Sequence, residues 1–172
     1  MAGRADDEPV DVVDESDRVV GVVPRWVMRR DRLRHRAVFI AVQSSAGVWL
    51  VHRRADDKDI WPGRWDLAVG GVVASGETYD AAAQRELAEE LGVDGAPLIE
   101  LGGGRFDDAD VSLIGRCYRT VHDGPFHFVD GEISEVRWTH VEELVDMAGV
   151  AGLFVPDSVA LVLPLLVVPP TG

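Results

Sequence analysis

The most constraining feature of the sequence is the run from residue 71 to residue 93, which carries the start and stop signals of a helix. Thr78 is of a type favoured at helix N-caps, and Asp80 follows in the first turn, where negative charge is favourable. Gly92 follows the last residue of the helical pattern, as a C′ glycine does. The sequence therefore predicts a helix over residues 79–91.

Three glutamates share one face of this predicted helix. At 100° per residue, Glu86, Glu89 and Glu90 fall within about 100° of arc. The spacing of Glu86 and Glu90 is unfavourable by roughly a few tenths of a kcal/mol, unless a cation lies between the carboxylates. Because hard divalent cations take oxygen ligands, the pattern indicates a metal site. The alternative is an ordinary solvated acidic face, which would usually gain from Lys or Arg at the position of Glu90.

The same run resembles the signature of the Nudix hydrolases, G-x5-E-x7-R-E-U-x-E-E-x-G-U, in which U is aliphatic. The fixed positions are filled by Gly71, Glu77, Arg85, Glu86, Leu87, Glu89, Glu90, Gly92 and Val93. The resemblance covers about residues 36–147 and implies an α/β fold, the Nudix α/β/α sandwich with a mixed β-sheet. It also implies hydrolysis of a diphosphate bond in a nucleoside-diphosphate-linked or related small molecule.

The resemblance further implies a metal cofactor, Mg²⁺, with Mn²⁺ as the other candidate ion. Glu86, Glu89 and Glu90 are the expected ligands, joined by the main-chain carbonyl of Gly71. Such a metal neutralises charge that develops on the diphosphate and lowers the pKa of a bound water.

Supporting and proton-transfer roles follow from the same resemblance. Arg85 is expected to orient Glu86 or to pair with Glu77 and so fix the acids in place. Members of the family differ in which acid is the general base. Glu86 and Glu135 both remain candidates.

Five residues outside the signature are predicted to contact the substrate: Arg53, Arg54, Arg64, Trp61 and His35. Guanidinium groups suit phosphate oxygens, and a tryptophan can stack on a base. Lys58 lies in the same segment. Each of these residues also has an ordinary interpretation, as a solvent-facing charge, as loop packing, or as a histidine satisfied by backbone.

Part of the chain resembles one branch of the superfamily, the isopentenyl-diphosphate isomerase-like proteins. The residues concerned are Val12-Val-Asp14-Glu-Ser-Asp17, Gly21, Arg25, His35-Arg-Ala-Val-Phe39, Arg53-Arg54 and Trp61-Pro-Gly63-Arg-Trp65-Asp66. In the isomerases a catalytic cysteine precedes the glycine that opens the signature, and a metal-binding histidine follows that glycine. Here Gly70 and Val72 occupy those places, and Met28 replaces the partner of His35. Since alkene isomerisation needs an acid and a base on opposite faces, the missing thiol disfavours it.

Composition excludes some partners and bounds the fold. The formal charge of −13 argues against a nucleic-acid polymer as partner. The single cysteine, Cys117, is expected to pack in the core, and a reducing cytoplasm is the simplest location. The apolar segment 159–168 is too short to cross a membrane and contains a proline. It is expected to form a helix that is either buried or faces a second subunit, so a homodimer is one of the two alternatives for the assembly.

The order of the predicted elements agrees with one domain over residues 10–172 that follows a disordered segment, residues 1–9. Hairpins are expected over residues 10–23 and 37–52, then the glutamate helix. Strands are expected near residues 98–101, 111–121, 126–128 and 135–139, with a glycine-rich loop at 102–104 that makes Phe106 mobile. A helix is expected at residues 141–147.

The charges near the N-terminus are segregated, with seven acids over residues 6–17 followed by six arginines over residues 25–36. The simpler interpretation is mutual salt bridging between exposed segments. The alternative is a local positive field that attracts an anionic substrate.

Overall fold

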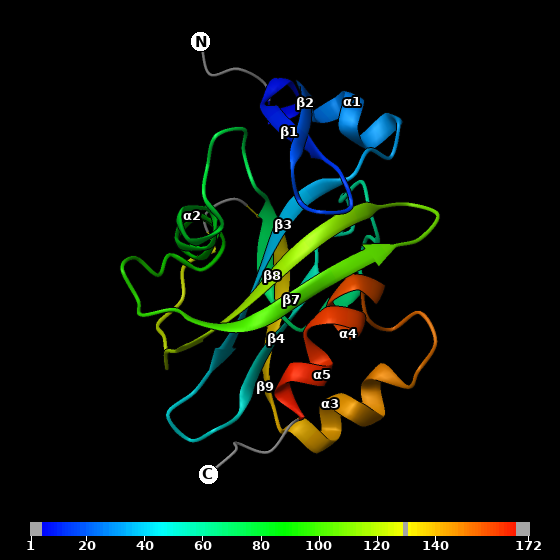
Figure 1. Cartoon of the computed structure of the whole chain (residues 1–172). Coiled ribbons are helices and arrows are strands. Elements are labelled where there is room, and N and C mark those ends of the chain that lie inside the picture. Colours follow the sequence, from blue (N-terminus) through cyan, green and yellow to red (C-terminus); the bar gives the residue numbers. More distant parts are fainter. Residues whose placement is uncertain (1–4, 129–130, 168–172) are drawn as a thin grey trace.

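Strand β3 (His35–Gln43) lies at the centre of the fold because its side chains alternate between two hydrophobic cores. Val38 and Ile40 belong to the core that also contains the buried face of α2 (Tyr79–Leu91). Ala37 and Phe39 belong to the core on the opposite face of the sheet. The computed structural model, which describes residues 5–128 and 131–167, therefore has helices on both sides of one sheet (Figure 1).

The sheet is mixed and has nine strands. Its other members are β1 (Pro9–Val13), β2 (Val19–Pro24), β4 (Trp49–Arg54), β5 (Trp65–Asp66), β6 (Val69–Val72), β7 (Ile99–Asp107), β8 (Ser112–Val121) and β9 (Ile133–Thr139). Strand β3 pairs parallel with β8 and antiparallel with β6, whereas β4 pairs antiparallel with β9 and β5. The α/β class predicted from the sequence is confirmed.

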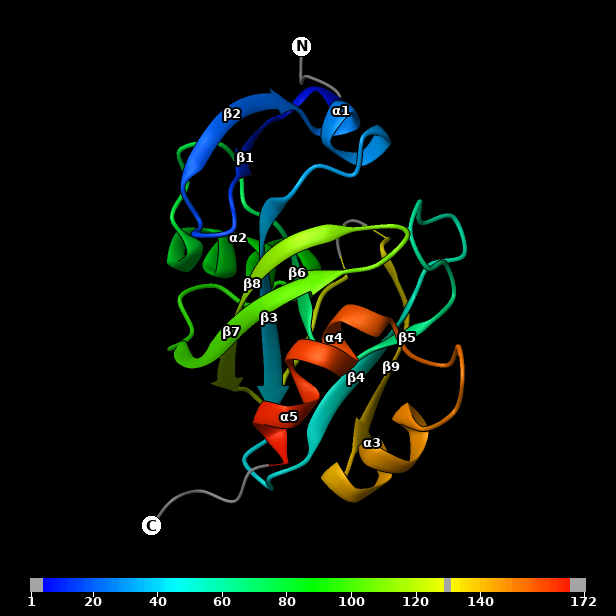
Figure 2. The same ribbon diagram turned by 45° about the vertical axis from the view of Figure 1, so that its right-hand side comes forward.

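Helix α2 covers one face of the sheet, and the C-terminal helices cover the other, as two views show (Figures 1 and 2). The remaining helices are α1 (Arg25–Arg30), α3 (Val141–Ala148), α4 (Pro156–Leu161) and α5 (Leu163–Leu166), and a short 3-10 turn, η1, spans Ala5–Asp7. The bounds of α2 are those predicted from the sequence, and α3 extends one residue beyond the predicted helix at residues 141–147. In α2 the Thr78 side chain accepts a hydrogen bond from the Ala81 amide, and Gly92 has φ 67°.

Two sequence predictions about strands are corrected. The glycines at 102–104 do not form a loop, because β7 continues through them. At Gly103 a Cβ would lie 2.2 Å from the carbonyl oxygen of Gly115 on β8, so glycine is what lets the two strands approach. Phe106 is consequently a strand residue, and its ring meets that of Trp61 edge-on.

No strand forms at residues 126–128. The amide of His127 instead donates to the carbonyl oxygen of Leu91 at the end of α2, 2.9 Å away. The second predicted hairpin is also looser than expected. Strands β3 and β4 pair only at Gln43 and Trp49, after which each takes other partners.

The chain ends differ from expectation. The sequence predicts disorder over residues 1–9, of which residues 1–4 lie outside the described part. Residues 5–7 form η1, and Pro9 opens β1 opposite Pro24, so order begins earlier than predicted.

The apolar C-terminal segment forms two short helices, α4 and α5, rather than one helix, and its last residue, Val168, lies outside the described part. Leu161 and Leu165 pack in the core opposite α2. Among the described residues no helix is long and apolar enough to cross a membrane. Cys117 is fully buried in the same core as Leu161, as predicted.

Candidate active site

The buried ends of two glutamates on α2 face the backbone of β6. Glu86 and Glu90 are only 8% and 6% exposed. The amide of Gly70 donates to Oε1 of Glu90 at 3.3 Å. At Gly71 a Cβ would lie 2.4 Å from Oε1 of Glu86, so the glycine leaves the space that this carboxylate occupies. Helix α2 and the two glycines of β6, Gly70 just before the signature and Gly71 at its start, thus form one site.

Burial dominates the electrostatics of this pair. It raises the pKa of Glu86, although the Arg85 guanidinium opposes the shift. Burial raises the pKa of Glu90 well above its ordinary value, and the nearby carboxylates of Glu86, Glu132 and Asp66 act in the same direction. Carboxylates crowded in a buried site favour protonation or a cation. The site is therefore short of positive charge.

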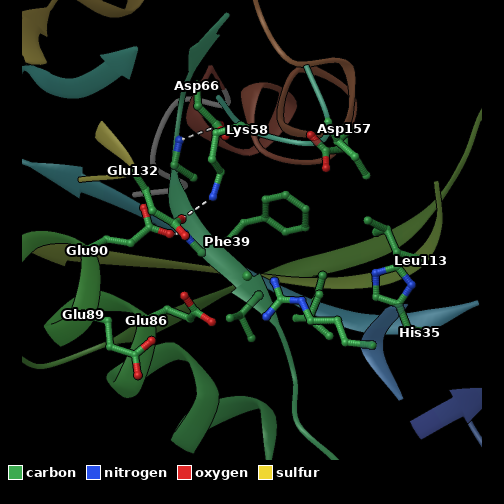
Figure 3. A pocket seen from close by; sticks show the side chains of 18 of the residues that line it. His35, Phe39, Lys58, Asp66, Glu86, Glu89, Glu90, Leu113, Glu132 and Asp157 are labelled. Atoms are coloured by element: carbon green, nitrogen blue, oxygen red, sulfur yellow. Dashed lines mark hydrogen bonds and ion pairs between the residues drawn. The ribbon is translucent and has the colours of Figure 1, made fainter. Parts of the chain in front are cut away.

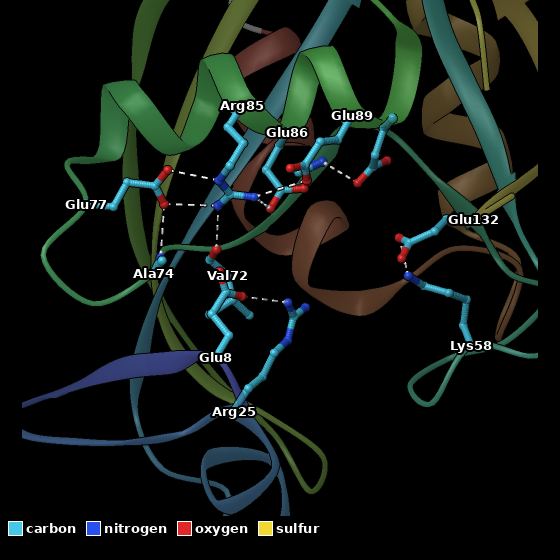
Figure 4. Close-up of polar contacts among 12 residues, drawn as sticks. Glu8, Arg25, Lys58, Val72, Ala74, Glu77, Arg85, Glu86, Glu89 and Glu132 are labelled. Atoms are coloured by element: carbon cyan, nitrogen blue, oxygen red, sulfur yellow. Dashed lines mark hydrogen bonds and ion pairs between the residues drawn. The ribbon is translucent and has the colours of Figure 1, made fainter. Parts of the chain in front are cut away.

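Arg85 holds the acids of the site in position (Figure 4). Its Nε and Nη2 donate to the two carboxylate oxygens of Glu77 at 2.9 and 3.0 Å. Nη1 donates to Oε1 of Glu86 at 2.7 Å and to Oε2 of Glu89 at 3.2 Å, and Nη2 also reaches the carbonyl of Val72 at 3.2 Å. The sequence left orientation of Glu86 and pairing with Glu77 as alternatives for Arg85. In the structure it does both.

Glu89 differs from the other two glutamates. Its side chain is 56% exposed, and its ion pair with Arg85 directs it along the helix surface. Among the described residues, no three His, Cys, Asp or Glu side chains are gathered as a complete set of metal ligands. Mg²⁺, however, is usually bound through one or two carboxylates and keeps several waters. Glu86 and Glu90, with the uncovered backbone at Gly71, fit such an ion, and Glu89 would join it only after turning from Arg85.

A cavity of about 930 Å³ opens beside the glutamates (Figure 3). Glu86, Glu89 and Glu90 lie at one end, His35 and Leu113 lie at the other, and Phe39 lies between them. Ligand pockets commonly span about 300–1,000 Å³, so the cavity can hold a molecule the size of a nucleotide.

Of the predicted substrate residues, Arg54, Trp61 and His35 line the cavity. Arg54 donates to the carbonyl oxygen of Ile60 at 3.0 Å. His35 is 3% exposed, burial lowers its pKa to about 4, and its Nδ1 lies 3.0 Å from the carbonyl oxygen of Leu33. The ring is therefore neutral near pH 7.

Arg53, Arg64 and Glu135 are not among the residues that line the cavity. Arg53 pairs with Asp56 on the surface at 3.0 Å, and Glu135 is exposed on β9. Glu132, three residues earlier, lines the cavity instead and hydrogen-bonds to Lys58. The sequence prediction named Glu135 as a candidate base and did not consider Glu132, which lies just before β9 (Ile133–Thr139).

Sequence reasoning missed three buried polar residues of the cavity, His52, Asp66 and Asp157, and named Arg29 only as one of the six arginines over residues 25–36. His52 and Asp66 face each other in the register of β4 and β5. Asp157 comes from α4, which lies far along the chain. The sequence carries a signal for His52 and Asp66, because each is a polar residue next to apolar residues of a strand. Asp157 reaches the cavity only through tertiary packing.

Comparisons with known proteins point to one family. The model of the NUDIX domain family matches residues 33–157. An uncharacterized Nudix hydrolase of Yersinia pestis is 42% identical over 151 residues, which cover 88% of this chain and 81% of that protein. One from Pseudomonas aeruginosa is 42% identical over 150 residues, covering 86% of this chain and 89% of that protein.

Solved structures show the same fold. The crystal structure of DR0079 from Deinococcus radiodurans superposes with a TM-score of 0.74 at 31% identity, covering 89% of this chain and 95% of that chain. A MutT protein from Methanosarcina mazei, at 22% identity and a TM-score of 0.61, covers 66% of this chain and 82% of its own and supports the fold alone. With the family model, the relatives and the arrangement of Glu86, Glu90 and Arg85 in agreement, this chain belongs to the Nudix hydrolases, which act on diphosphate bonds.

Proposed function

We propose that the protein is a Mg²⁺-dependent hydrolase that cleaves the diphosphate bond of a nucleoside-diphosphate-linked or related small molecule. The observation that carries the proposal is the pair Glu86 and Glu90, two buried carboxylates with too little positive charge around them, at one end of a 930 Å³ cavity. A bound divalent cation would offset that charge, and a diphosphate would supply the remaining oxygen ligands.

The metal, when bound, neutralises charge on the diphosphate and lowers the pKa of a coordinated water. Residues of the chain hold the ion, keep its ligands in place and accept the proton. Glu86 and Glu90 would hold the ion, and Arg85 keeps Glu86 in place through its hydrogen bond while Glu77 fixes Arg85. Glu86 and Glu132 are the candidates to take the proton from water, because both line the cavity and Glu135 does not.

The isomerase alternative finds no support in the local backbone. The position of the isomerase cysteine is Gly70, where a Cβ would lie 1.9 Å from the carbonyl oxygen of Val38. Any side chain there would require β3 and β6 to separate. The acid that isomerisation needs therefore has no place at this position.

A second alternative is a module that binds a nucleotide without turnover. The intact glutamates and their Arg85 support count against it, because binding alone does not need two buried carboxylates held at some energetic cost.

One incubation separates the three functions. The full chain is mixed with Mg²⁺ and a panel of diphosphates that includes ADP-ribose, a dinucleoside polyphosphate, nucleoside triphosphates and isopentenyl diphosphate. Release of phosphate or a nucleoside monophosphate supports the hydrolase, and a product of unchanged mass supports the isomerase. Saturable binding without turnover across the panel contradicts both and supports the sensor.

Location and assembly are further proposals. A cytoplasmic location rests on the single buried thiol, and a homodimer rests on the apolar residues that stay exposed in α3 and at the end of α5, Val145 and Val167. Light scattering on the purified chain tests the second: a monomer mass at every concentration contradicts a homodimer.

A further inference from the structure

Most arginines of the segment 25–36 have a partner. Arg36 pairs with Asp17 at 2.6 Å, Arg30 with Asp31 at 2.7 Å and Arg34 with Asp107 at 3.7 Å. Arg32 donates to the carbonyl oxygen of Asp108, and Arg25 lies 3.6 Å from Glu8. The simpler interpretation, salt bridging between the two charged segments, therefore holds for Arg25 and Arg36, whereas Arg30, Arg32 and Arg34 find partners outside the acidic segment.

Arg29 is the exception. Within residues 5–128 and 131–167 its guanidinium has neither a hydrogen bond nor an ion pair. It lies on α1 one turn after Arg25, and both residues line the cavity that contains the glutamates. The other cations of the cavity are engaged: Arg54 by the carbonyl of Ile60, Lys58 by Glu132, and Arg85 by Glu77.

The surroundings of Arg29 make an unpaired charge unfavourable. Burial lowers its pKa to about 10, and the like charges of Arg25 and Arg54 add to the effect. Asp59 and Asp157 act in the opposite direction, but neither comes within ion-pair distance in the described structure. Nearby on the same wall is His35, which is neutral because it is buried. A partly buried charge without a partner is unfavourable, so this guanidinium would gain from a bound anion.

We propose that Arg29, assisted by Arg25, is an anion-binding subsite that takes a phosphate group of the substrate at the wall of the cavity formed by α1. The inference rests on the proposed function, because it assigns the second phosphoryl group of a diphosphate to this wall. A planar guanidinium can donate two parallel hydrogen bonds to phosphate oxygens. Glu86 and Glu90 with their ion would then hold one end of the diphosphate and Arg29 the other.

Inorganic pyrophosphate is the direct probe, because it carries the two phosphoryl groups and nothing else. Its binding to the full chain is measured by isothermal titration calorimetry in EDTA, so that no metal site contributes. Arg29→Gln removes the charge at the subsite. Arg30→Gln, on the same helix, removes an exposed charge that forms an ion pair with Asp31 and lies over the Trp26 ring; because Arg30 does not line the cavity, it is the matched control.

The proposal predicts saturable binding by the wild type and by Arg30→Gln, with at least a tenfold weaker affinity for Arg29→Gln and partial recovery in Arg29→Lys. Equal binding by Arg29→Gln and the wild type, or no saturable binding by the wild type, overturns it. Thermal unfolding without ligand controls for the fold. Because the substitution removes an unpaired, partly buried charge, Arg29→Gln should unfold no earlier than the wild type.

The same titration distinguishes failure of the subsite from failure of the proposed function. If the chain lacks hydrolase activity but the subsite is real, pyrophosphate still binds and Arg29→Gln still weakens it. If the hydrolase assignment is right and the subsite is wrong, turnover is present while the KM of Arg29→Gln equals that of the wild type.

Discussion

The carboxylate of Glu86 occupies the space that a side chain at Gly71 would fill. A Cβ built at Gly71 would lie 2.4 Å from Oε1 of Glu86 and 2.7 Å from its Cδ. The contact is with the end of a flexible side chain rather than with backbone. Gly71 thus leaves room for a carboxylate of the candidate site without contributing a side chain of its own.

Gly71→Ala is therefore expected to displace Glu86 while leaving the fold intact. Turnover of a diphosphate substrate should fall about 10- to 100-fold, the range for changes that misplace a metal ligand. Steady-state kinetics and thermal unfolding measure the two effects. The control is Gly21→Ala, because nothing lies within 4 Å of a Cβ at Gly21. Full activity in Gly71→Ala would contradict a role for Glu86 in its observed position.

Arg85→Lys tests the support of the acids. Lysine keeps the charge but cannot donate from two nitrogens to Glu77 while a third contact holds Glu86. We expect a 10- to 100-fold loss of kcat with a smaller change in KM. Arg116→Lys, an exposed cation that lies over the Tyr79 ring, serves as the control. If charge alone mattered at residue 85, both variants would behave like the wild type.

Glu132, just before β9, and Glu135, within β9, are a matched pair of acids whose variants test which residue accepts the proton from water. Glu132 lines the cavity and Glu135 does not. Glu135→Gln should leave the pH–rate profile unchanged, whereas Glu132→Gln should lower kcat about 10²- to 10⁴-fold if Glu132 is the general base. A normal rate in Glu132→Gln would leave Glu86 as the base. A loss confined to Glu135→Gln would contradict the assignment of the cavity.

Asp157 should make stability depend on pH. Burial raises its pKa to about 7, and the carboxylate of Asp66 adds to the shift while Arg54 opposes it. Because the folded state then binds more protons than the unfolded chain between about pH 4 and 7, this group lowers the free energy of unfolding as pH rises through that window. In Asp157→Asn the free energy of unfolding should no longer show this decrease, which is about 1–4 kcal/mol between pH 4 and 7.

Urea denaturation at pH 5 and pH 7.5 measures that contribution. The difference in unfolding free energy between the two pH values should be smaller in Asp157→Asn than in the wild type. Asp146→Asn, an exposed position on α3, controls for the loss of one negative charge. The same pH dependence in wild type and Asp157→Asn would show that Asp157 is charged throughout.

The parts of the fold that local sequence signals encode were predictable. Helix α2 begins after Thr78 and ends before Gly92 as its caps indicate, since capping depends only on neighbouring residues. The strands β1, β2 and β8 likewise show their alternating or apolar patterns directly.

What could not be predicted depends on contacts between distant segments. The glycines at 102–104 have the composition of a loop, and only the approach of β8 makes them a strand. Which of Glu132 and Glu135 lines the cavity depends on how β9 pairs with β4, where the register shifts between Arg53 and Arg54, and a single sequence does not show that pairing. The sequence could not show that Arg29 lacks a partner. The other five arginines of the segment 25–36 look the same in the sequence and do have partners.

The central claim is that Glu86 and Glu90 hold a divalent cation on which diphosphate hydrolysis depends. It is tested most directly by titrating Mg²⁺ or Mn²⁺ into the metal-free chain by calorimetry and measuring hydrolysis of ADP-ribose and other diphosphates in parallel. Glu90→Gln is compared with Glu100→Gln, an exposed acid on β7 that pairs with Arg116. The account predicts metal binding and turnover in the wild type and in Glu100→Gln, with both lost in Glu90→Gln. No heat on metal titration of the wild type, or full turnover by Glu90→Gln, would contradict it.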